Sequence, residues 1–149
     1  INIPINITKN SNIDVVVELV GGSDGLAKKI VISALNNKKH VITANKALIA
    51  KHGNYLSLLA EKNKVNLEFE ASVAGGIPII RGIKEGLVSN KIYKLVGILN
   101  GTSNYILTEM EHSGKKFSDV LKEAQNSGFA EKNPKNDLNG NDVSSKIKI

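Results

Sequence analysis

The chain has 149 residues, of which 41% are hydrophobic and 23% charged, as in an ordinary globular protein that is large enough for a sizeable core. It contains no cysteine, which excludes a disulfide framework, a thiolate metal site and a cysteine nucleophile. The net charge of +6 comes with scattered lysine pairs and only 4% aromatic residues, so we expect no nucleic-acid partner. Because no apolar run reaches membrane-spanning length and no N-terminal signal pattern is present, we expect no membrane partner and a cytoplasmic location.

The first half of the sequence alternates between strand and helix patterns. Asp14–Val20 and His40–Ala44 predict two short strands, the first with the apolar run of a buried parallel strand, and Val65–Phe69 predicts a third. Helical spacing follows the first strand over Leu26–Leu35, and a second helix region follows the next strand, broken or capped at Gly53–Asn54. This order implies right-handed crossovers and a parallel sheet with helices on its faces.

The carboxyl ends of these strands form a candidate cofactor site, because ligands of open parallel sheets bind beyond that edge. The candidate cofactor-binding residues there are Gly21, Gly22, Thr43 and Lys46. An ordinary glycine turn and an exposed lysine would explain the same residues. The sequence has no G-x-G-x-x-G fingerprint, which in a dinucleotide-binding fold would lie upstream of Ile1.

Glycines and a proline mark the next segment. Gly75–Gly76 predicts a turn, and Pro78 suits the first turn of a following helix. Exposed carbonyls of such a turn beside the Glu70 carboxylate could hold a hard cation, whereas the alternative is a plain turn before a helix.

Beyond this turn, Tyr93–Leu99 predicts a strand, and helices are expected over Tyr105–Met110 and Phe117–Ala124. The Asn100–Asn104 run at the start of the first helix could bind a carboxylate or phosphate, or act in ordinary helix capping.

A polar run over Gly128–Lys146 closes the sequence, with Pro134 and Asn139–Gly140 predicting a loop before a final helix. Asp142 and Lys146 are i,i+4 neighbours on that helix, in the favourable order. Taken by itself, this run is better explained as a solvated loop followed by a surface ion pair of little energetic value.

Taken together, the motifs resemble the homoserine dehydrogenase family along nearly the whole chain. The matching stretches occur in the family's order: Val17–Gly22, Val41–Leu48, Phe69–Ile80, Gly97–Leu107, and Gly128–Glu131 through Asp137, Gly140, Asp142 and Lys146. The resemblance implies an α/β fold: the C-terminal part of a doubly wound, Rossmann-like parallel sheet over residues 1–68, then the start of an α+β substrate and dimerisation domain over residues 69–149. Both domains are expected to be incomplete.

The activity that the resemblance implies is reversible reduction of L-aspartate 4-semialdehyde to L-homoserine with NADP or NAD, in the biosynthesis of threonine, methionine and isoleucine. It implies that Lys146 donates the proton and that Asp142 is the acid beside it. Glu131 and Asp137 match carboxylates that hold the substrate, and Lys46 matches a lysine near the nicotinamide.

The resemblance also implies a sodium ion and a homodimer of the full-length protein. The sodium site would use Glu70 and the carbonyls of Val73, Gly75 and Ile77.

The sequence departs from the family pattern in the missing glycine-rich phosphate loop and in Asn133, where many relatives have aspartate. We therefore expect a fragment that is inactive and poorly soluble alone, because an incomplete sheet leaves an apolar edge open. The alternatives are a related NAD(P)-dependent oxidoreductase acting on another small aldehyde or hydroxy acid, and a non-catalytic nucleotide-fold binding module.

Overall fold

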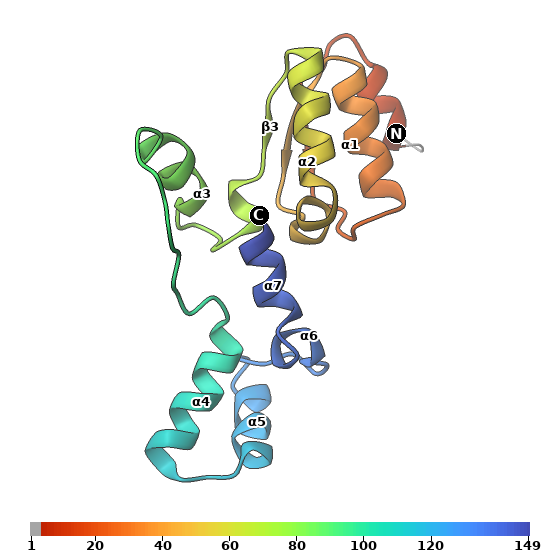
Figure 1. Ribbon diagram of the computed structural model, residues 1–149. Coiled ribbons are helices and arrows are strands. Elements are labelled where there is room, and N and C mark those ends of the chain that lie inside the picture. Colours follow the sequence, from red (N-terminus) through yellow and green to blue (C-terminus); the bar gives the residue numbers. More distant parts are fainter. Residues whose placement is uncertain (1–3) are drawn as a thin grey trace. The chain divides into compact units, whose positions relative to one another are not determined.

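The structure, a computed structural model, describes residues 4–149 (Figure 1). These residues form two compact units. The first contains the described residues up to Lys91 together with Lys148–Ile149, and the second contains Ile92–Ile147. Over the described part of the chain, none of the helices has both the length and the apolar character that a membrane span requires.

A parallel three-stranded sheet organises the first unit, as the alternation of patterns predicts. In the order β1-β2-β3, the strands are Val15–Glu18, His40–Thr43 and Leu67–Glu68. Val16 is in register with Val41, and Val41 with Leu67, so these three buried side chains share one face of the sheet.

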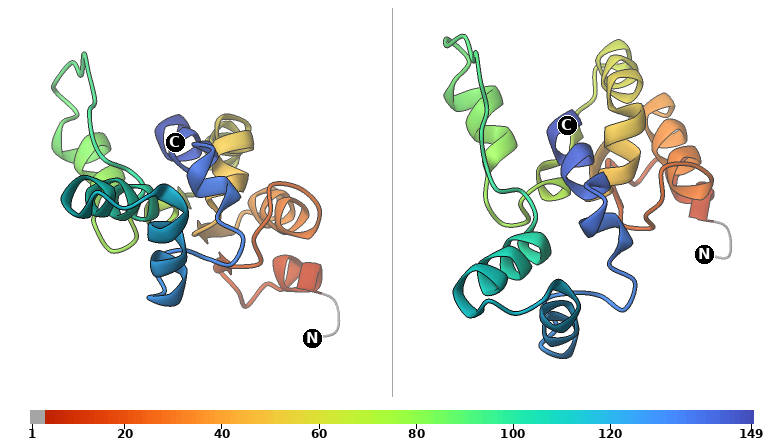
Figure 2. Two further views of the ribbon diagram at one scale, coloured as in Figure 1. Left: turned by 90° about the horizontal axis from the view of Figure 1, so that it is seen from below. Right: turned by 60° about the horizontal axis from the view of Figure 1, so that its bottom comes forward.

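Two helices cover that face. They are α1 (Leu26–Asn36) and α2 (Lys46–Asn63), which lie side by side over the strands (Figures 1 and 2). Their fully buried leucines Leu35, Leu48 and Leu56 join the apolar side chains of the strands in one core. Two successive right-handed crossovers in the same direction place both helices on the same side.

The opposite face of the sheet is open among the described residues. Val15, Val17 and Ile42 are 46%, 57% and 45% exposed. The prediction of a buried first strand is therefore correct for one face only, because no second layer of described residues covers the other. A 3-10 helix, η1 (Pro4–Lys9), packs against α1, where the buried Thr8 hydroxyl lies 2.6 Å from that of Ser33.

The predicted break at Gly53–Asn54 is wrong, because α2 runs unbroken through both residues. A glycine inside a helix costs about 1 kcal/mol relative to alanine. Burial of Ile49 before this point and of Leu56 and Ala60 after it offsets that cost, since all three belong to the same core.

The segment after β3 forms short helical turns rather than one helix. These are the 3-10 turn η2 (Glu70–Ser72), α3 (Ile79–Arg81) and the π-helical turn η3 (Gly82–Gly86). Pro78 lies at the N-cap of α3.

The second unit is built from helices. They are α4 (Gly101–Ser113), α5 (Phe117–Asn126), α6 (Lys135–Leu138) and α7 (Asn141–Lys148, whose last residue belongs to the first unit). Helices α4 and α5 form an antiparallel pair around Ile106, Val120 and Ala124 (Figure 1). The polar run predicted as a loop contains the short helix α6.

The strand predicted over Tyr93–Leu99 is wrong. This segment has no strand conformation, and Tyr93, Val96 and Ile98 are 78–85% exposed. Its pattern suits a strand, but a strand forms only where another strand pairs with it, and none of the described residues does so.

We expect Leu56→Ala to lower the free energy of unfolding by about 2–5 kcal/mol, because it removes a fully buried side chain and leaves a cavity. Leu58→Ala is the matched control on the same helix, since Leu58 is 66% exposed, and we expect a change of about 0.5 kcal/mol or less. Urea unfolding of the two variants measures the difference. Equal losses would contradict the assignment of the buried face of α2.

Candidate active site

A buried carboxylate joins the first two strands at the carboxyl edge of the sheet. Glu18 is only 1% exposed. Its Oε1 accepts hydrogen bonds from the backbone N–H groups of Val20 (2.7 Å) and Gly21 (3.1 Å). Its Oε2 accepts a bond from the Thr43 hydroxyl (2.7 Å), whose oxygen in turn accepts from the backbone N–H of Asn45 (3.0 Å). These donors offset the cost of burying a charge.

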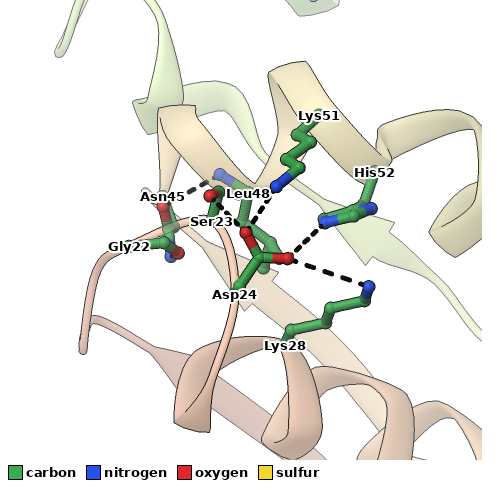
Figure 3. A network of polar contacts seen from close by, with 8 residues as sticks. All are labelled: Gly22, Ser23, Asp24, Lys28, Asn45, Leu48, Lys51 and His52. Atoms are coloured by element: carbon green, nitrogen blue, oxygen red, sulfur yellow. Dashed lines mark hydrogen bonds and ion pairs between the residues drawn. The ribbon is translucent and has the colours of Figure 1, made fainter.

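Asn45 links the turn after β1 to the start of α2. Its Oδ1 caps the helix by accepting from Leu48 N (3.1 Å), while its Nδ2 donates to the carbonyl of Gly22 (2.8 Å; Figure 3). Gly21 and Gly22 have φ values of 84° and 79°, which favour glycine. Lys46, half-buried, is the first residue of α2. The structure thus brings the four predicted cofactor residues to one edge of the sheet.

A second contact between the turn and α2 is made by Asp24 (Figure 3). Its carboxylate lies 2.6 Å from Lys51 Nζ, 3.0 Å from His52 Nε2 and 3.9 Å from Lys28 Nζ. The hydrogen bond from Lys51, with those from Ser23 and His52, holds the pKa of Asp24 well below its ordinary value of 3.8. Because the Asp24 and Lys51 side chains are exposed, we expect their ion pair to contribute little to stability.

In the second unit, Lys146 and Asp142 form the ion pair that their spacing predicts, with 2.7 Å between Nζ and Oδ2. Their side chains are 20% and 9% exposed, so the pair is largely shielded from water. Lys146 Nζ also donates to the carbonyl of Leu99 at 2.5 Å. The ammonium group of Lys146 is therefore held by two partners. In an exposed surface ion pair, we would expect only the carboxylate to hold it.

Asn100 connects this pair to a second carboxylate, that of Asp137. Its Nδ2 donates to Asp137 Oδ1 (2.8 Å) and to Asp142 Oδ2 (2.9 Å). Asn100, Asp137, Asp142 and Lys146 line one open hollow of about 650 Å³. The sequence singled out the Asn100–Asn104 run for its donors, but its spacing gave no sign that Asn100 contacts both acids.

One predicted substrate residue lies apart from this cluster. Glu131 is exposed and is not among the residues that line the hollow. Sequence reasoning also missed a pair of aromatic rings in the lining, Tyr105 and Phe129, whose centroids are 4.5 Å apart in a stacked arrangement. The aromatic pair gives the hollow an apolar wall next to its charged groups.

Glu70, the candidate sodium ligand, caps a helix in this structure. Its two carboxylate oxygens accept from the backbone N–H groups of Ile80 (3.0 Å) and Arg81 (2.8 Å). Val73 is buried, whereas Gly75 and Ile77 are exposed. Across residues 4–149, no group of three or more histidine, aspartate or glutamate side chains is placed to hold a metal ion.

A parallel strand–helix–strand–helix–strand unit with a glycine turn at its carboxyl edge defines the nucleotide-binding class of α/β fold. The family model described as the NAD binding domain of homoserine dehydrogenase matches residues 5–70, and that described as homoserine dehydrogenase matches residues 78–149. The chain belongs to the homoserine dehydrogenase family.

Individual relatives agree with the two family models. The chain is 53% identical to the homoserine dehydrogenase of Neisseria gonorrhoeae over 146 residues, covering 98% of this chain and 33% of that protein. For the enzyme of Pseudomonas aeruginosa the identity is 54% over 140 residues, covering 94% and 32%. The chain spans about a third of the length of these curated relatives.

Solved structures give the same result. A homoserine dehydrogenase from Thiobacillus denitrificans superposes with a TM-score of 0.91 at 50% identity, covering 97% of this chain and 33% of that one. A hyperthermophilic archaeal homoserine dehydrogenase in complex with NADPH superposes with a TM-score of 0.88 at 30% identity, covering 97% and 44%. These likenesses confirm the predicted parallel α/β fold.

We expect Thr43→Val to destabilise the first unit by about 1–3 kcal/mol, because it leaves an oxygen of the buried Glu18 carboxylate and the N–H of Asn45 without their partner. Thr43→Ser keeps the hydroxyl and serves as the control, with a loss below about 1.5 kcal/mol for one buried methyl group. Thermal unfolding compares the two. A valine variant as stable as the wild type would show that these hydrogen bonds do not stabilise the unit.

Proposed function

We propose that the protein containing this sequence reversibly reduces L-aspartate 4-semialdehyde to L-homoserine with NADP or NAD, in the biosynthesis of threonine, methionine and isoleucine. The observation that carries this proposal is the Lys146–Asp142 pair, fixed by Leu99 and Asn100 beside an open hollow. Membership of the homoserine dehydrogenase family supports this choice of substrate and reaction class. We also propose a cytoplasmic location.

The residues at the carboxyl edge of the sheet fit a nicotinamide cofactor. A side chain built on Gly21 or Gly22 would meet no atom within 4 Å, so this turn is open to a ligand, and both residues are exposed. Lys46 adds a positive charge beside the turn at the start of α2, which suits the negatively charged cofactor. Thr43 contributes indirectly, because its hydroxyl is engaged with Glu18. When bound, the cofactor supplies the hydride.

Lys146 then acts as the proton donor. A lysine ammonium has three N–H donors, and within the described residues two of them are engaged, by Leu99 O and by Asp142. The third is available for the carbonyl oxygen of an aldehyde in the hollow. As hydride reaches the carbonyl carbon, negative charge develops on that oxygen, and a nearby cation that donates a proton stabilises it.

The carboxylates hold the substrate's amino group. A buried ammonium ion costs several kcal/mol unless it is paired. Asp137 lines the hollow, and within the described residues its second carboxylate oxygen accepts no hydrogen bond. Glu131 joins it only if the segment around it moves toward the hollow, because its side chain is exposed here.

We further propose a sodium ion at Glu70 and the carbonyls of Val73, Gly75 and Ile77. The proposal is supported by the carboxylate beside a glycine turn, since each carboxylate oxygen retains lone pairs after accepting one backbone bond. A higher unfolding temperature in sodium than in potassium chloride, lost in Glu70→Gln, is expected. Equal temperatures in the two salts would exclude the site.

We also propose that the protein containing this sequence forms a homodimer. The exposed apolar side chains of Tyr93, Val96 and Ile98 support this proposal, because a second subunit could cover them. Sedimentation velocity of the complete protein measures the oligomeric state, and a monomer at micromolar concentration would contradict the proposal.

We expect Lys146→Ala to lower kcat by about 100-fold or more, the usual contribution of a general acid. The assay follows nicotinamide absorbance with L-aspartate 4-semialdehyde, in the protein that contains this sequence. Lys148→Ala, an exposed lysine on the same helix, is the control and should keep wild-type kcat. Turnover that survives Lys146→Ala would exclude Lys146 as the proton donor. A wild type inactive with both cofactors would overturn the proposed function.

A further inference from the structure

Asn100 lies at the centre of the hydrogen bonds around the lysine. It is 6% exposed and immediately precedes α4. Its Oδ1 accepts from Ser103 N at 2.8 Å and so caps the helix. The two hydrogens of its amide nitrogen account for the bonds to Asp137 and Asp142, one for each carboxylate. Every polar atom of this side chain is therefore engaged.

These bonds extend to Lys146. The same Oδ2 of Asp142 that accepts from Asn100 also pairs with Lys146 Nζ. The residue before Asn100 contributes the carbonyl that accepts from Lys146. The dipeptide Leu99–Asn100 thus holds the ammonium group at two points, once directly through a carbonyl and once through Asp142.

An amide suits this position better than a charged group would. Asp137 and Asp142 carry like charges, and an amide group that donates one N–H to each of them lowers their repulsion without adding a charge. An additional cation between them would compete with Lys146 for Asp142. It would also compete with a substrate ammonium for Asp137.

We propose that Asn100 is a positioning residue for the reaction, which fixes Asp142, and through it Lys146 Nζ, in the orientation needed to deliver a proton. The inference rests on the proposed function, in which Lys146 is the proton donor. Small displacements of a catalytic group reduce its contribution strongly, so loss of the two amide bonds should reduce turnover although no reacting group is removed.

Two substitutions separate this role from helix capping. Serine and aspartate are N-cap residues about as good as asparagine, so both preserve the bond to Ser103 N. Asn100→Ser removes the two N–H donors to the carboxylates. Asn100→Asp keeps the shape of the side chain but replaces the donors by a third carboxylate. Asn126→Ser, at an exposed position at the end of α5, is the control.

We expect kcat to fall about tenfold or more in Asn100→Ser and further in Asn100→Asp, with no change in Asn126→Ser. A double-mutant cycle tests the route of the effect. In a Lys146→Ala background, Asn100→Ser should lower kcat less than twofold, because the group that it positions is gone. An equal loss in both backgrounds would overturn the proposal in favour of a structural role.

A second measurement does not depend on turnover. The rate at which an amine-reactive anhydride labels Lys146, followed by mass spectrometry, should rise severalfold in Asn100→Ser and stay at the wild-type rate in Asn126→Ser. If the wild type does not reduce the semialdehyde, the proposed function fails, and the labelling rate alone decides whether Asn100 fixes the lysine. A labelling rate in Asn100→Ser within twofold of wild type would overturn the proposal.

Discussion

The position of the candidate cofactor site at the carboxyl edge of the sheet depends on the hydrogen bonds that the buried Glu18 carboxylate accepts. A charged group that is 1% exposed costs several kcal/mol unless donors surround it, and in residues 4–149 its hydrogen-bond partners are two backbone N–H groups and a hydroxyl. The backbone donors lie in the turn that follows β1, and the hydroxyl belongs to β2. Burying the charge therefore fixes the turn against the neighbouring strand, and the glycines of that turn stay open to a ligand.

The carboxyl edge of the sheet and the hollow around Lys146 have one feature in common. In each, an asparagine caps a helix with its side-chain oxygen and donates from its side-chain nitrogen to a second element. Asn45 does this between α2 and Gly22, and Asn100 between α4 and the two aspartates. Serine, threonine and aspartate also cap helices, but none of them offers an acceptor together with two N–H donors. The amide thus couples the start of a helix to the place where a ligand would bind.

Local patterns were enough to predict most of the elements but not every contact between them. The apolar runs of β1 and β2 and the spacing of α1, α4 and α5 predicted those elements, and the i,i+4 spacing of Asp142 and Lys146 predicted their ion pair. The predicted helix break at Gly53 was wrong because the packing of α2 against the core outweighs the low helix propensity of one glycine. The strand prediction for Tyr93–Leu99 failed because a mostly apolar segment says nothing about which strand would pair with it. The link from Asn100 to Asp137 and Asp142 joins residues 37 and 42 positions apart, which no local pattern encodes.

The open face of the sheet has a thermodynamic consequence. Val15, Val17 and Ile42 bring aliphatic carbon into contact with water, whereas parallel sheets are ordinarily covered on both faces. Any layer that comes to cover this face will remove apolar surface from water, so its docking should carry a negative change in heat capacity. Near room temperature such docking is driven mainly by the entropy of released water, and it weakens on cooling.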